Sequence, residues 1–302
     1  MAQATIAVVG GGLMGAGIAQ VFAVAGRKVV VHEPFEQVRD TIVDRIRDNL
    51  RVIGADVKAA GLVSVTGSLA EAVADAEFVT EAAPEKLDLK REIFTKLIAE
   101  APRSAILASN SSVMPVGDIA GGMETADRIV GTHWWNPAPL IPLVEVIQGT
   151  ETSDETIEKT MALLSSVGKK PAHVKKDVAG FVANRLQHAL WREAIAMVAN
   201  GICDAKTVDD CVKNSFGMRL PVLGPLENAD LVGLDLTLDI HKTIIPALDR
   251  SDGPSPLLEE LIGEGRLGFK SNEGFQKWSE TDQAVLRKRL TDHLVAANRA
   301  RE

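Results

Sequence analysis

The sequence Ile6-Ala7-Val8-Val9-Gly10-Gly11-Gly12-Leu13-Met14-Gly15 determines how the first part of the chain folds. A short apolar run predicts a buried strand, the glycines predict a tight turn, and the apolar residues that follow predict a helix. Gly10, Gly12 and Gly15 have the G-x-G-x-x-G spacing. In this pattern the first glycine permits the turn, the second lets the backbone approach a pyrophosphate, and the third lets helix and strand pack closely.

A helix that begins at this turn offers free N–H groups and the positive end of its dipole to an anion. We therefore expect a dinucleotide to contact Gly10, Gly12, Leu13, Met14 and Gly15. The alternative is a glycine-rich turn without a ligand. The strand before the turn and the helix after it favour the dinucleotide site.

The segment Lys28-Val29-Val30-Val31-His32-Glu33 predicts the second strand, with an acid at its end. A carboxylate at this place binds the adenosine ribose hydroxyls. It also repels a 2′-phosphate, so Glu33 favours NAD over NADP. The alternative is an acid that simply faces solvent.

Apolar runs alternate with helical segments over roughly the first 180 residues, which predicts a doubly wound parallel sheet of the Rossmann type. Further strands are expected at 61–66, 76–82, 105–108, 129–132, 142–147 and 172–175, and helices at 35–53, 69–74, 87–99 and 153–167. The pattern then becomes helical, with segments at 180–199, 204–217, 229–248 and 281–299. The predicted fold class is therefore α/β, with a Rossmann domain at 1–178 and an all-α domain at 179–302.

The composition excludes several classes of protein. The chain has 302 residues and a net charge of −8, which argues against a surface for nucleic acid or anionic membranes. Charged residues interrupt every apolar run before it could span a bilayer, and no secretory signal is predicted. The two cysteines, Cys203 and Cys211, fit a reducing compartment, so we expect a cytoplasmic protein. The histidines and acids show no metal-binding spacing, so no metal is predicted.

Polar residues follow or interrupt the predicted strands at positions where chemistry is possible. His133 follows a strand at the ligand-binding edge of the sheet, and histidine is suited to general base catalysis. Glu145 stands in an otherwise apolar strand, where a buried carboxylate needs a partner such as an imidazolium. A strand-end histidine and an exposed glutamate would explain the pattern equally well. Trp134 and Trp135 can line a substrate pocket or pack in the core, and Asn184 can face a cleft or solvent.

Together these segments resemble the 3-hydroxyacyl-CoA dehydrogenase family, and in motif detail its lambda-crystallin and L-gulonate 3-dehydrogenase branch. The resemblance runs nearly end to end. It rests on the glycine turn and on Ala108-Ser109-Asn110-Ser111-Ser112, His133-Trp134-Trp135-Asn136-Pro137, Leu143-Val144-Glu145-Val146 and Gly180-Phe181-Val182-Ala183-Asn184-Arg185. It implies an NAD-dependent dehydrogenase and a homodimer formed through the helical domain, which would also bind substrate.

The resemblance also implies roles for individual residues. His133 would be the general base and Glu145 the carboxylate that orients it. Ser112 and Asn184 would hydrogen-bond the reacting oxygen of the substrate. The residues implied to line the NAD site are Glu33, Glu85, Lys90, Ser112, Asn136 and Lys270.

The chain departs from the acyl-CoA enzymes of that family in two places. Their lysine-rich arm after the second strand, which helps to receive CoA, is shortened here, and Pro142 replaces a basic residue that is common before the Leu-Val-Glu segment. Arg219 can bind a carboxylate with two hydrogen bonds, although a surface arginine is an equally good interpretation. We therefore expect a small carboxylated substrate that presents a hydroxyl or a hydrated aldehyde.

Two other functions stay open at this point. One is an L-3-hydroxyacyl-CoA dehydrogenase of the 3-hydroxybutyryl-CoA type. The other belongs to a different class, a non-catalytic crystallin-like or NAD-sensing protein, because a fold does not fix a function. The presence of His133, Glu145, Ser112 and Asn184 favours an enzyme.

Overall fold

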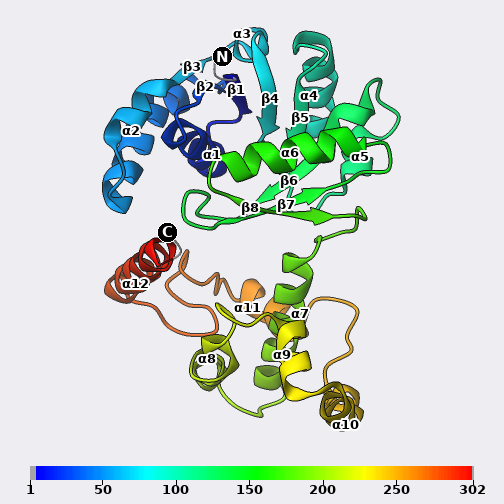
Figure 1. The fold of residues 1–302 in the computed structure, drawn as a ribbon. Coiled ribbons are helices and arrows are strands. Elements are labelled where there is room, and N and C mark those ends of the chain that lie inside the picture. The colour runs from blue at the N-terminus through cyan, green and yellow to red at the C-terminus, as the bar shows by residue number, and fades with distance from the viewer. Residues whose placement is uncertain (1–4, 301–302) are drawn as a thin grey trace. The chain divides into compact units, whose positions relative to one another are not determined.

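An eight-stranded sheet forms the centre of the first unit of the computed structural model, which describes residues 5–300 (Figure 1). The strand order is β3-β2-β1-β4-β5-β6-β7-β8. The strands are β1 (Thr5–Val9), β2 (Lys28–His32), β3 (Val63–Thr66), β4 (Ala76–Glu81), β5 (Ile106–Ser109), β6 (Ile129–Trp134), β7 (Leu143–Ile147) and β8 (Lys170–Val174). The order from β3 to β6 is that of a Rossmann fold, which confirms the predicted fold class.

Strand β7 runs antiparallel to β6, whereas β7 and β8 are parallel. This corrects the expectation of a sheet that is parallel throughout. The loop 135–142 between β6 and β7 is shorter than the dozen or so residues that a crossover connection needs. The antiparallel register places His133 directly opposite Glu145.

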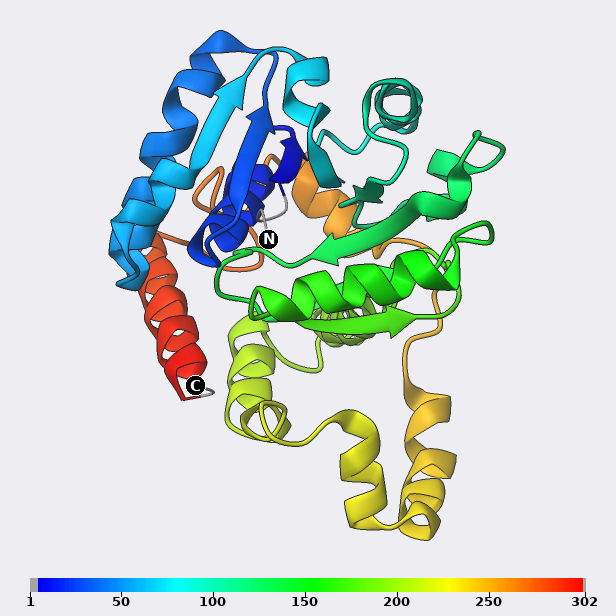
Figure 2. The same ribbon diagram turned by 45° about the horizontal axis from the view of Figure 1, so that its top comes forward.

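Helices cover both faces of this sheet (Figure 2). Because successive side chains of a strand point to opposite faces, each strand contributes to two cores. Phe22 and Ile46 belong to the core on one face, and Phe94 and Leu97 to the core on the other. The helices of this part are α1 (Leu13–Val24), α2 (Glu36–Ile53), η1 (Val57–Leu62), α3 (Leu69–Val73), α4 (Leu87–Glu100), α5 (Val116–Ala120), η2 (Ala126–Arg128) and α6 (Asp154–Ser166).

The chain divides into two compact units. One contains the described residues up to Asn184 and those from His293 onward, and the other is Arg185–Asp292. The last part of the chain therefore packs with the first unit, although it follows the second in sequence. The functional limits 1–178 and 179–302 stay a prediction.

The remaining elements are helical, as predicted. They are α7 (Ala183–Ala199), α8 (Ala205–Lys213), η3 (Phe216–Met218), α9 (Pro225–Val232), α10 (Leu234–Ile244), η4 (Ile245–Ala247), α11 (Pro256–Gly263) and α12 (Glu280–Arg299). Asp204 caps α8 by accepting a hydrogen bond of 2.7 Å from the backbone N–H of Thr207. Gly233, with φ of +101°, separates α9 from α10 within the segment expected to be helical. None of the described helices has both the length and the apolar character that a membrane span needs.

Candidate active site

The glycine turn has the geometry that a bound diphosphate requires. Gly10 has φ of +105°, and a Cβ atom on it would lie 2.8 Å from the carbonyl oxygen of Ala82. A Cβ atom on Gly15 would lie 1.8 Å from the carbonyl oxygen of Gly10, whereas one on Gly12 would meet nothing within 4 Å. The first turn of α1 has no side-chain cap and no acidic residue. Its N–H groups and the open space at Gly12 therefore fit the diphosphate of a dinucleotide.

Glu33 lies beside this turn, immediately after β2. Its carboxylate accepts a hydrogen bond from the backbone N–H of Gly11 at 2.9 Å and one from the N–H of Phe35 at 3.1 Å. Each carboxylate oxygen can accept more than one hydrogen bond. The fixed carboxylate can therefore still accept ribose hydroxyls, and this contact stays a prediction.

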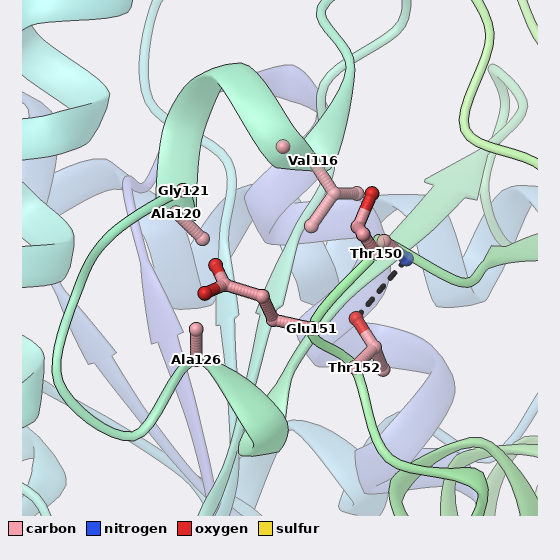
Figure 3. A pocket seen from close by; sticks show the side chains of 9 residues that line it. Val116, Ala120, Gly121, Ala126, Thr150, Glu151 and Thr152 are labelled. Carbon is pink, nitrogen blue, oxygen red and sulfur yellow. Dashed lines mark hydrogen bonds between the residues drawn. The ribbon is translucent and has the colours of Figure 1, made fainter.

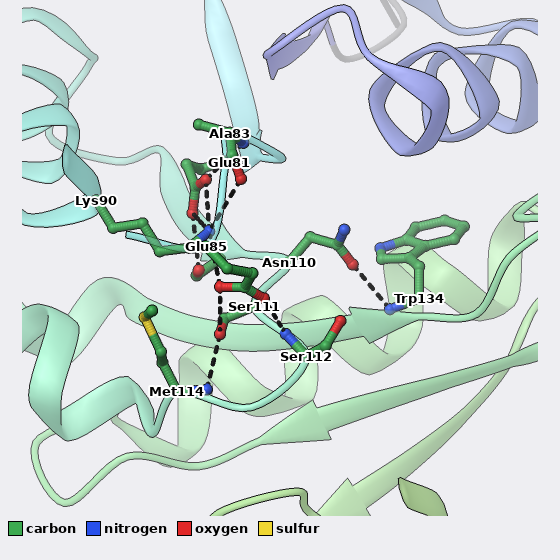
Figure 4. A network of polar contacts seen from close by, with 10 residues as sticks. Glu81, Ala83, Glu85, Lys90, Asn110, Ser111, Ser112, Met114 and Trp134 are labelled. Atoms are coloured by element: carbon green, nitrogen blue, oxygen red, sulfur yellow. Dashed lines mark hydrogen bonds and ion pairs between the residues drawn. The ribbon is translucent and has the colours of Figure 1, made fainter. Parts of the chain in front are cut away.

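A buried ion pair lies at the end of β4, close to the loop that follows β5 (Figure 4). The Nζ atom of Lys90 is 2.8 and 2.9 Å from the two carboxylate oxygens of Glu81. The exposed fractions of the two side chains are 1% and 0%, and the hydroxyl of Ser109 donates to the same carboxylate at 2.8 Å. Lys90 thus neutralises a buried acid, and its predicted contact with NAD stays a prediction.

Glu85 connects this ion pair to Ser112 (Figure 4). A carboxylate oxygen of Glu85 is 3.6 Å from the Nζ of Lys90, and the carboxylate accepts hydrogen bonds from the hydroxyl of Ser111 and the backbone N–H of Ser112. On the other side, the Nδ2 atom of Asn184 donates to the carbonyl oxygen of Ser112 at 3.1 Å. The structure thus brings Ser112 and Asn184 together and holds the backbone of Ser112 at both its N–H and its carbonyl group.

His133 and Glu145 form a buried hydrogen-bonded pair. The Nδ1 atom of His133 is 2.8 Å from Oε2 of Glu145, and the exposed fractions of the side chains are 5% and 1%. The other carboxylate oxygen accepts backbone N–H groups of Val182 and Ala183 at 2.9 and 3.1 Å. The contact that the family resemblance implied is therefore present, and the alternative of an exposed glutamate is wrong. Because Nδ1 faces the carboxylate, Nε2 is the ring nitrogen that can take a proton from a substrate.

The surroundings of Glu145 keep it ionised. Burial raises the pKa of this carboxyl, but the hydrogen bonds from His133, Ala183 and Val182 outweigh burial and hold the pKa below its ordinary value. Val182 and Ala183 lie at the start of α7, where N–H groups lack intrahelical partners. The carboxylate is thus a fixed negative charge beside the imidazole.

Trp135 and Phe181 lie next to the imidazole of His133, with ring centroids 5.3 and 5.5 Å away. Trp134 instead points to the opposite face of the sheet, because successive residues of a strand alternate. It is 2% exposed, and its ring lies 6.0 Å from that of Phe22 in the core. This burial argues against the predicted substrate contact of Trp134 and leaves Trp135 as the tryptophan beside the candidate base.

Lys169 holds the loop 135–142 that follows the histidine strand. Its Nζ atom donates to the carbonyl oxygens of Ala138 and Ile141, the latter at 2.9 Å, and lies 5.5 Å from the ring centroid of Trp134. Burial lowers the pKa of Lys169 to about 8. The loop is also held by Asn298 in the last turn of α12, whose Nδ2 donates to the carbonyl oxygen of Leu140 at 2.6 Å.

A small pocket beside α5 contains none of the predicted site residues (Figure 3). Val116, Thr150 and Glu151 are among the residues that line it. Its polar side chains are occupied in part by the loop itself, since Glu151 accepts a hydrogen bond from the N–H of Gly122. The candidate active site is therefore the His133 and Ser112 region and not this pocket.

Two family models match the chain. The NAD binding domain of 3-hydroxyacyl-CoA dehydrogenase matches residues 5–178, and the C-terminal domain of 3-hydroxyacyl-CoA dehydrogenase matches residues 180–278. The chain belongs to the 3-hydroxyacyl-CoA dehydrogenase family. It is therefore an NAD-dependent oxidoreductase that acts on CH–OH groups, as the sequence predicted. The lambda-crystallin and L-gulonate branch stays a prediction.

The relatives that are similar to this chain include enzymes named for two different classes of substrate. A 5-formyl-3-hydroxy-2-methylpyridine 4-carboxylate 5-dehydrogenase of Mesorhizobium japonicum is 32% identical over 306 residues, which cover 98% of both chains. The crystal structure of such a 5-dehydrogenase, described as an NAD+-dependent dismutase, has a TM-score of 0.90 at 31% identity and covers 99% of this chain and 98% of its own. A probable 3-hydroxybutyryl-CoA dehydrogenase of Bacillus subtilis is 36% identical over 284 residues, 91% of this chain and 97% of its own.

Two predicted residues, Arg219 and Lys270, lie in the second unit, where both side chains are exposed. Their contacts with substrate and cofactor stay predictions. The sequence reasoning missed Glu81 and the part that Phe181 plays beside His133. An acid at the end of an apolar strand, with a lysine further along the next helix, is the signal that could have revealed Glu81.

Proposed function

We propose that the protein oxidises a hydroxyl, or the hydrate of an aldehyde, on a small carboxylated molecule. The observation that carries this proposal is the buried pair of His133 and Glu145 with the Trp135 ring beside it. An aromatic wall suits a ring-shaped substrate, which can stack on it. The relative that acts on a pyridine carboxylate matches this chain over nearly the whole of both lengths.

The reaction requires a base at the hydroxyl and a partner for that base. His133 would take the hydroxyl proton at Nε2, and Glu145 would stabilise the imidazolium that forms. Ser112 and Asn184 would orient the reacting oxygen by hydrogen bonds. NAD, when bound, would accept the hydride that leaves the carbon bearing this hydroxyl.

The segment between α2 and β3 supports a substrate smaller than a CoA thioester. It consists of residues 54–62, most of which form the short helix η1, and it contains a single lysine, Lys58. A lysine-rich arm that could pair with the phosphates of CoA is therefore missing from this stretch. The acyl-CoA alternative still has support, because the Bacillus subtilis relative is 36% identical and is named as a probable 3-hydroxybutyryl-CoA dehydrogenase.

Steady-state assays with NAD separate these functions. We expect formyl or hydroxymethyl aromatic acids, L-gulonate or carnitine to give a higher kcat/KM than 3-hydroxybutyryl-CoA. A large preference for the CoA thioester would overturn the proposal. Failure of every hydroxy compound to reduce NAD would favour the non-catalytic alternative.

Arg219 would bind the carboxylate of the substrate. An arginine can hold a carboxylate with two parallel hydrogen bonds. We expect Arg219→Gln to raise KM for a carboxylated substrate and to leave KM unchanged for its uncharged amide. An equal change for both compounds would remove Arg219 from the proposal. The residues proposed to line the NAD site are Glu33, Glu85, Lys90, Ser112, Asn136 and Lys270.

We further propose that the protein is a cytoplasmic homodimer that pairs through the second unit. Helices α9 and α10 contain no buried residue, and Leu226, Leu231 and Leu234 are 79%, 74% and 64% exposed. Exposed apolar surface on this scale is typical of an interface. We expect light scattering to give the mass of a dimer and Leu231→Asp to give a monomer. A wild-type monomer at micromolar concentration would contradict the dimer.

A further inference from the structure

Arg45 lies on α2, next to the buried stripe formed by Ile42 and Ile46. Its side chain leaves that helix and reaches the glycine turn. Nη1 donates to the carbonyl oxygen of Gly11 at 3.1 Å, and Nη2 donates to the carbonyl oxygen of Gly12 at 3.0 Å. We propose that Arg45 is a positioning residue for the diphosphate of NAD. This rests on NAD binding, which the family establishes, and not on the substrate proposed above.

The two hydrogen bonds determine where the N–H groups of the turn point. In a trans peptide the carbonyl and the N–H point in opposite directions. With the carbonyls of Gly11 and Gly12 held toward Arg45, the N–H groups of Gly12 and Leu13 face the other side. The backbone at Gly12 is open to a ligand, because a Cβ atom there would meet nothing within 4 Å. Arg45 thus fixes the donors in the direction from which a diphosphate would arrive.

Other contacts fix the rest of the turn and leave these donors free. The N–H of Gly11 is taken by the carboxylate of Glu33 at 2.9 Å. The carbonyl of Gly12 also accepts the first helical hydrogen bond, from Ala16 at 3.0 Å. The N-terminus of α1 has no side-chain cap. The N–H of Gly10 is taken by the carbonyl oxygen of His32 at 2.8 Å. The turn is therefore held at its carbonyls and at these two N–H groups, while the amides of the first turn of α1 stay available.

Charge gives Arg45 a second effect. Glu33 places a negative charge beside the site of the diphosphate, and α1 itself carries no charged residue. The guanidinium of Arg45 offsets part of this negative charge. A cation that bonds a peptide carbonyl also polarises the N–H of the same peptide, because hydrogen bonds in a chain strengthen one another. Both effects favour a phosphate over an uncharged ligand.

Binding measurements by calorimetry separate this role from a general effect on folding. The ligands are NAD, ADP-ribose, which keeps the diphosphate, and adenosine, which lacks it. We expect Arg45→Gln to weaken the binding of ADP-ribose and of NAD by about tenfold. That factor corresponds to the loss of a half-buried charge-assisted hydrogen bond. Adenosine binding is expected to change less than about twofold, because it makes no phosphate contact.

The matched control is Arg47→Gln on the same helix. Arg47 pairs with Asp44 at the surface, and no hydrogen bond among the described residues joins it to the turn. We expect this variant to bind all three ligands like the wild type. The proposal would be overturned if Arg45→Gln bound ADP-ribose as tightly as the wild type. It would also be overturned if the variant lost as much affinity for adenosine as for ADP-ribose.

Arg45→Lys is the second variant, in case Arg45→Gln does not fold. Lysine keeps the charge but lacks the planar fork that reaches two carbonyls at once. We expect the affinity for ADP-ribose to fall about threefold and the affinity for adenosine to stay unchanged. If Arg45→Lys binds ADP-ribose as tightly as the wild type when Arg45→Gln is unfolded, the positioning role is wrong. Substrate turnover does not enter any of these measurements, so failure of the substrate proposal is recognised separately.

Discussion

Replacing Glu145 with glutamine tests whether the buried carboxylate orients His133, the proposed base. In the wild type the carboxylate accepts from Val182 and Ala183 with one oxygen and pairs with His133 through the other. In Glu145→Gln the two N–H groups at the start of α7 would fix the amide oxygen on their side. The amide N–H₂ would then face Nδ1 of His133. The imidazole would have to carry its proton on Nε2, which is the wrong tautomer for a base.

The expected loss of activity follows from that geometry. A hydrogen bond to a charged group is worth roughly 1.5–3 kcal/mol, and each 1.4 kcal/mol is about a factor of ten in rate. Losing the charge therefore costs about 10- to 100-fold, and the wrong tautomer adds to it. We expect kcat to fall at least ~100-fold, while the Kd for NAD stays within about twofold because Glu145 contacts no part of the predicted NAD site.

The assay is steady-state reduction of NAD across pH, together with calorimetric binding of NAD. The control is Glu155→Gln, which removes an exposed carboxylate that pairs with Lys159 on the surface of α6. A Glu145→Gln enzyme with kcat within threefold of the wild type and an unchanged pH profile would refute the reasoning.

For Glu145→Gln we also predict how the free energy of unfolding depends on pH. The pKa of Glu145 is held below its ordinary value of about 4.5. A carboxyl with a lowered pKa in the folded state stabilises the fold above its unfolded pKa, and that contribution is lost as the pH falls through the folded value. The difference in unfolding free energy between wild type and Glu145→Gln should therefore shrink below about pH 4.5. Denaturant titrations at pH 7 and at lower pH measure it.

Three further predictions concern single positions. His133→Ala should lower kcat at least ~100-fold with nearly normal NAD binding; normal turnover would remove His133 as the base. Gly15→Ala should lower the free energy of unfolding by about 3 kcal/mol or more, because its Cβ would overlap a backbone oxygen. Gly12→Ala should fold normally and lose NAD binding. Calorimetry distinguishes the two variants, and equal stability of both would contradict the packing at Gly15. Lys169 has a pKa of about 8, below its unfolded value, so its contribution to stability should rise between about pH 8 and 10, as measured against Lys169→Met; a difference that does not change with pH would contradict the lowered pKa.

The sheet was predictable because its strands carry continuous apolar runs separated by clear breaks. The glycine turn and the predicted eight strands all form, and α/β alternation identified the class. The antiparallel direction of β7 was not predicted, since apolar periodicity carries no information on strand direction. The length of the loop 135–142 does indicate the strand direction, because a crossover connection to a parallel strand does not fit into so few residues.

The candidate site was predictable where a charged residue interrupts an apolar strand. Glu145 interrupts an apolar strand, and the structure supplies the partner that its burial demands. Trp134 and Trp135 could not be separated by residue type. Only the structure places Trp134, the last residue of β6, in the core and the ring of Trp135, which follows the strand, beside His133. Arg45 could not be found from sequence, because it reaches the turn from a helix more than thirty residues away.

The hydrogen bond from Asn298 to the carbonyl of Leu140 has a consequence for biosynthesis. Domains generally fold from the N-terminus while the ribosome is still adding residues. The first unit here cannot receive this contact until translation has passed Asn298, long after its sheet has emerged. The loop 135–142 after β6 therefore gains its last support late, so a chain that stops earlier would carry the pair of His133 and Glu145 on a less firmly held scaffold.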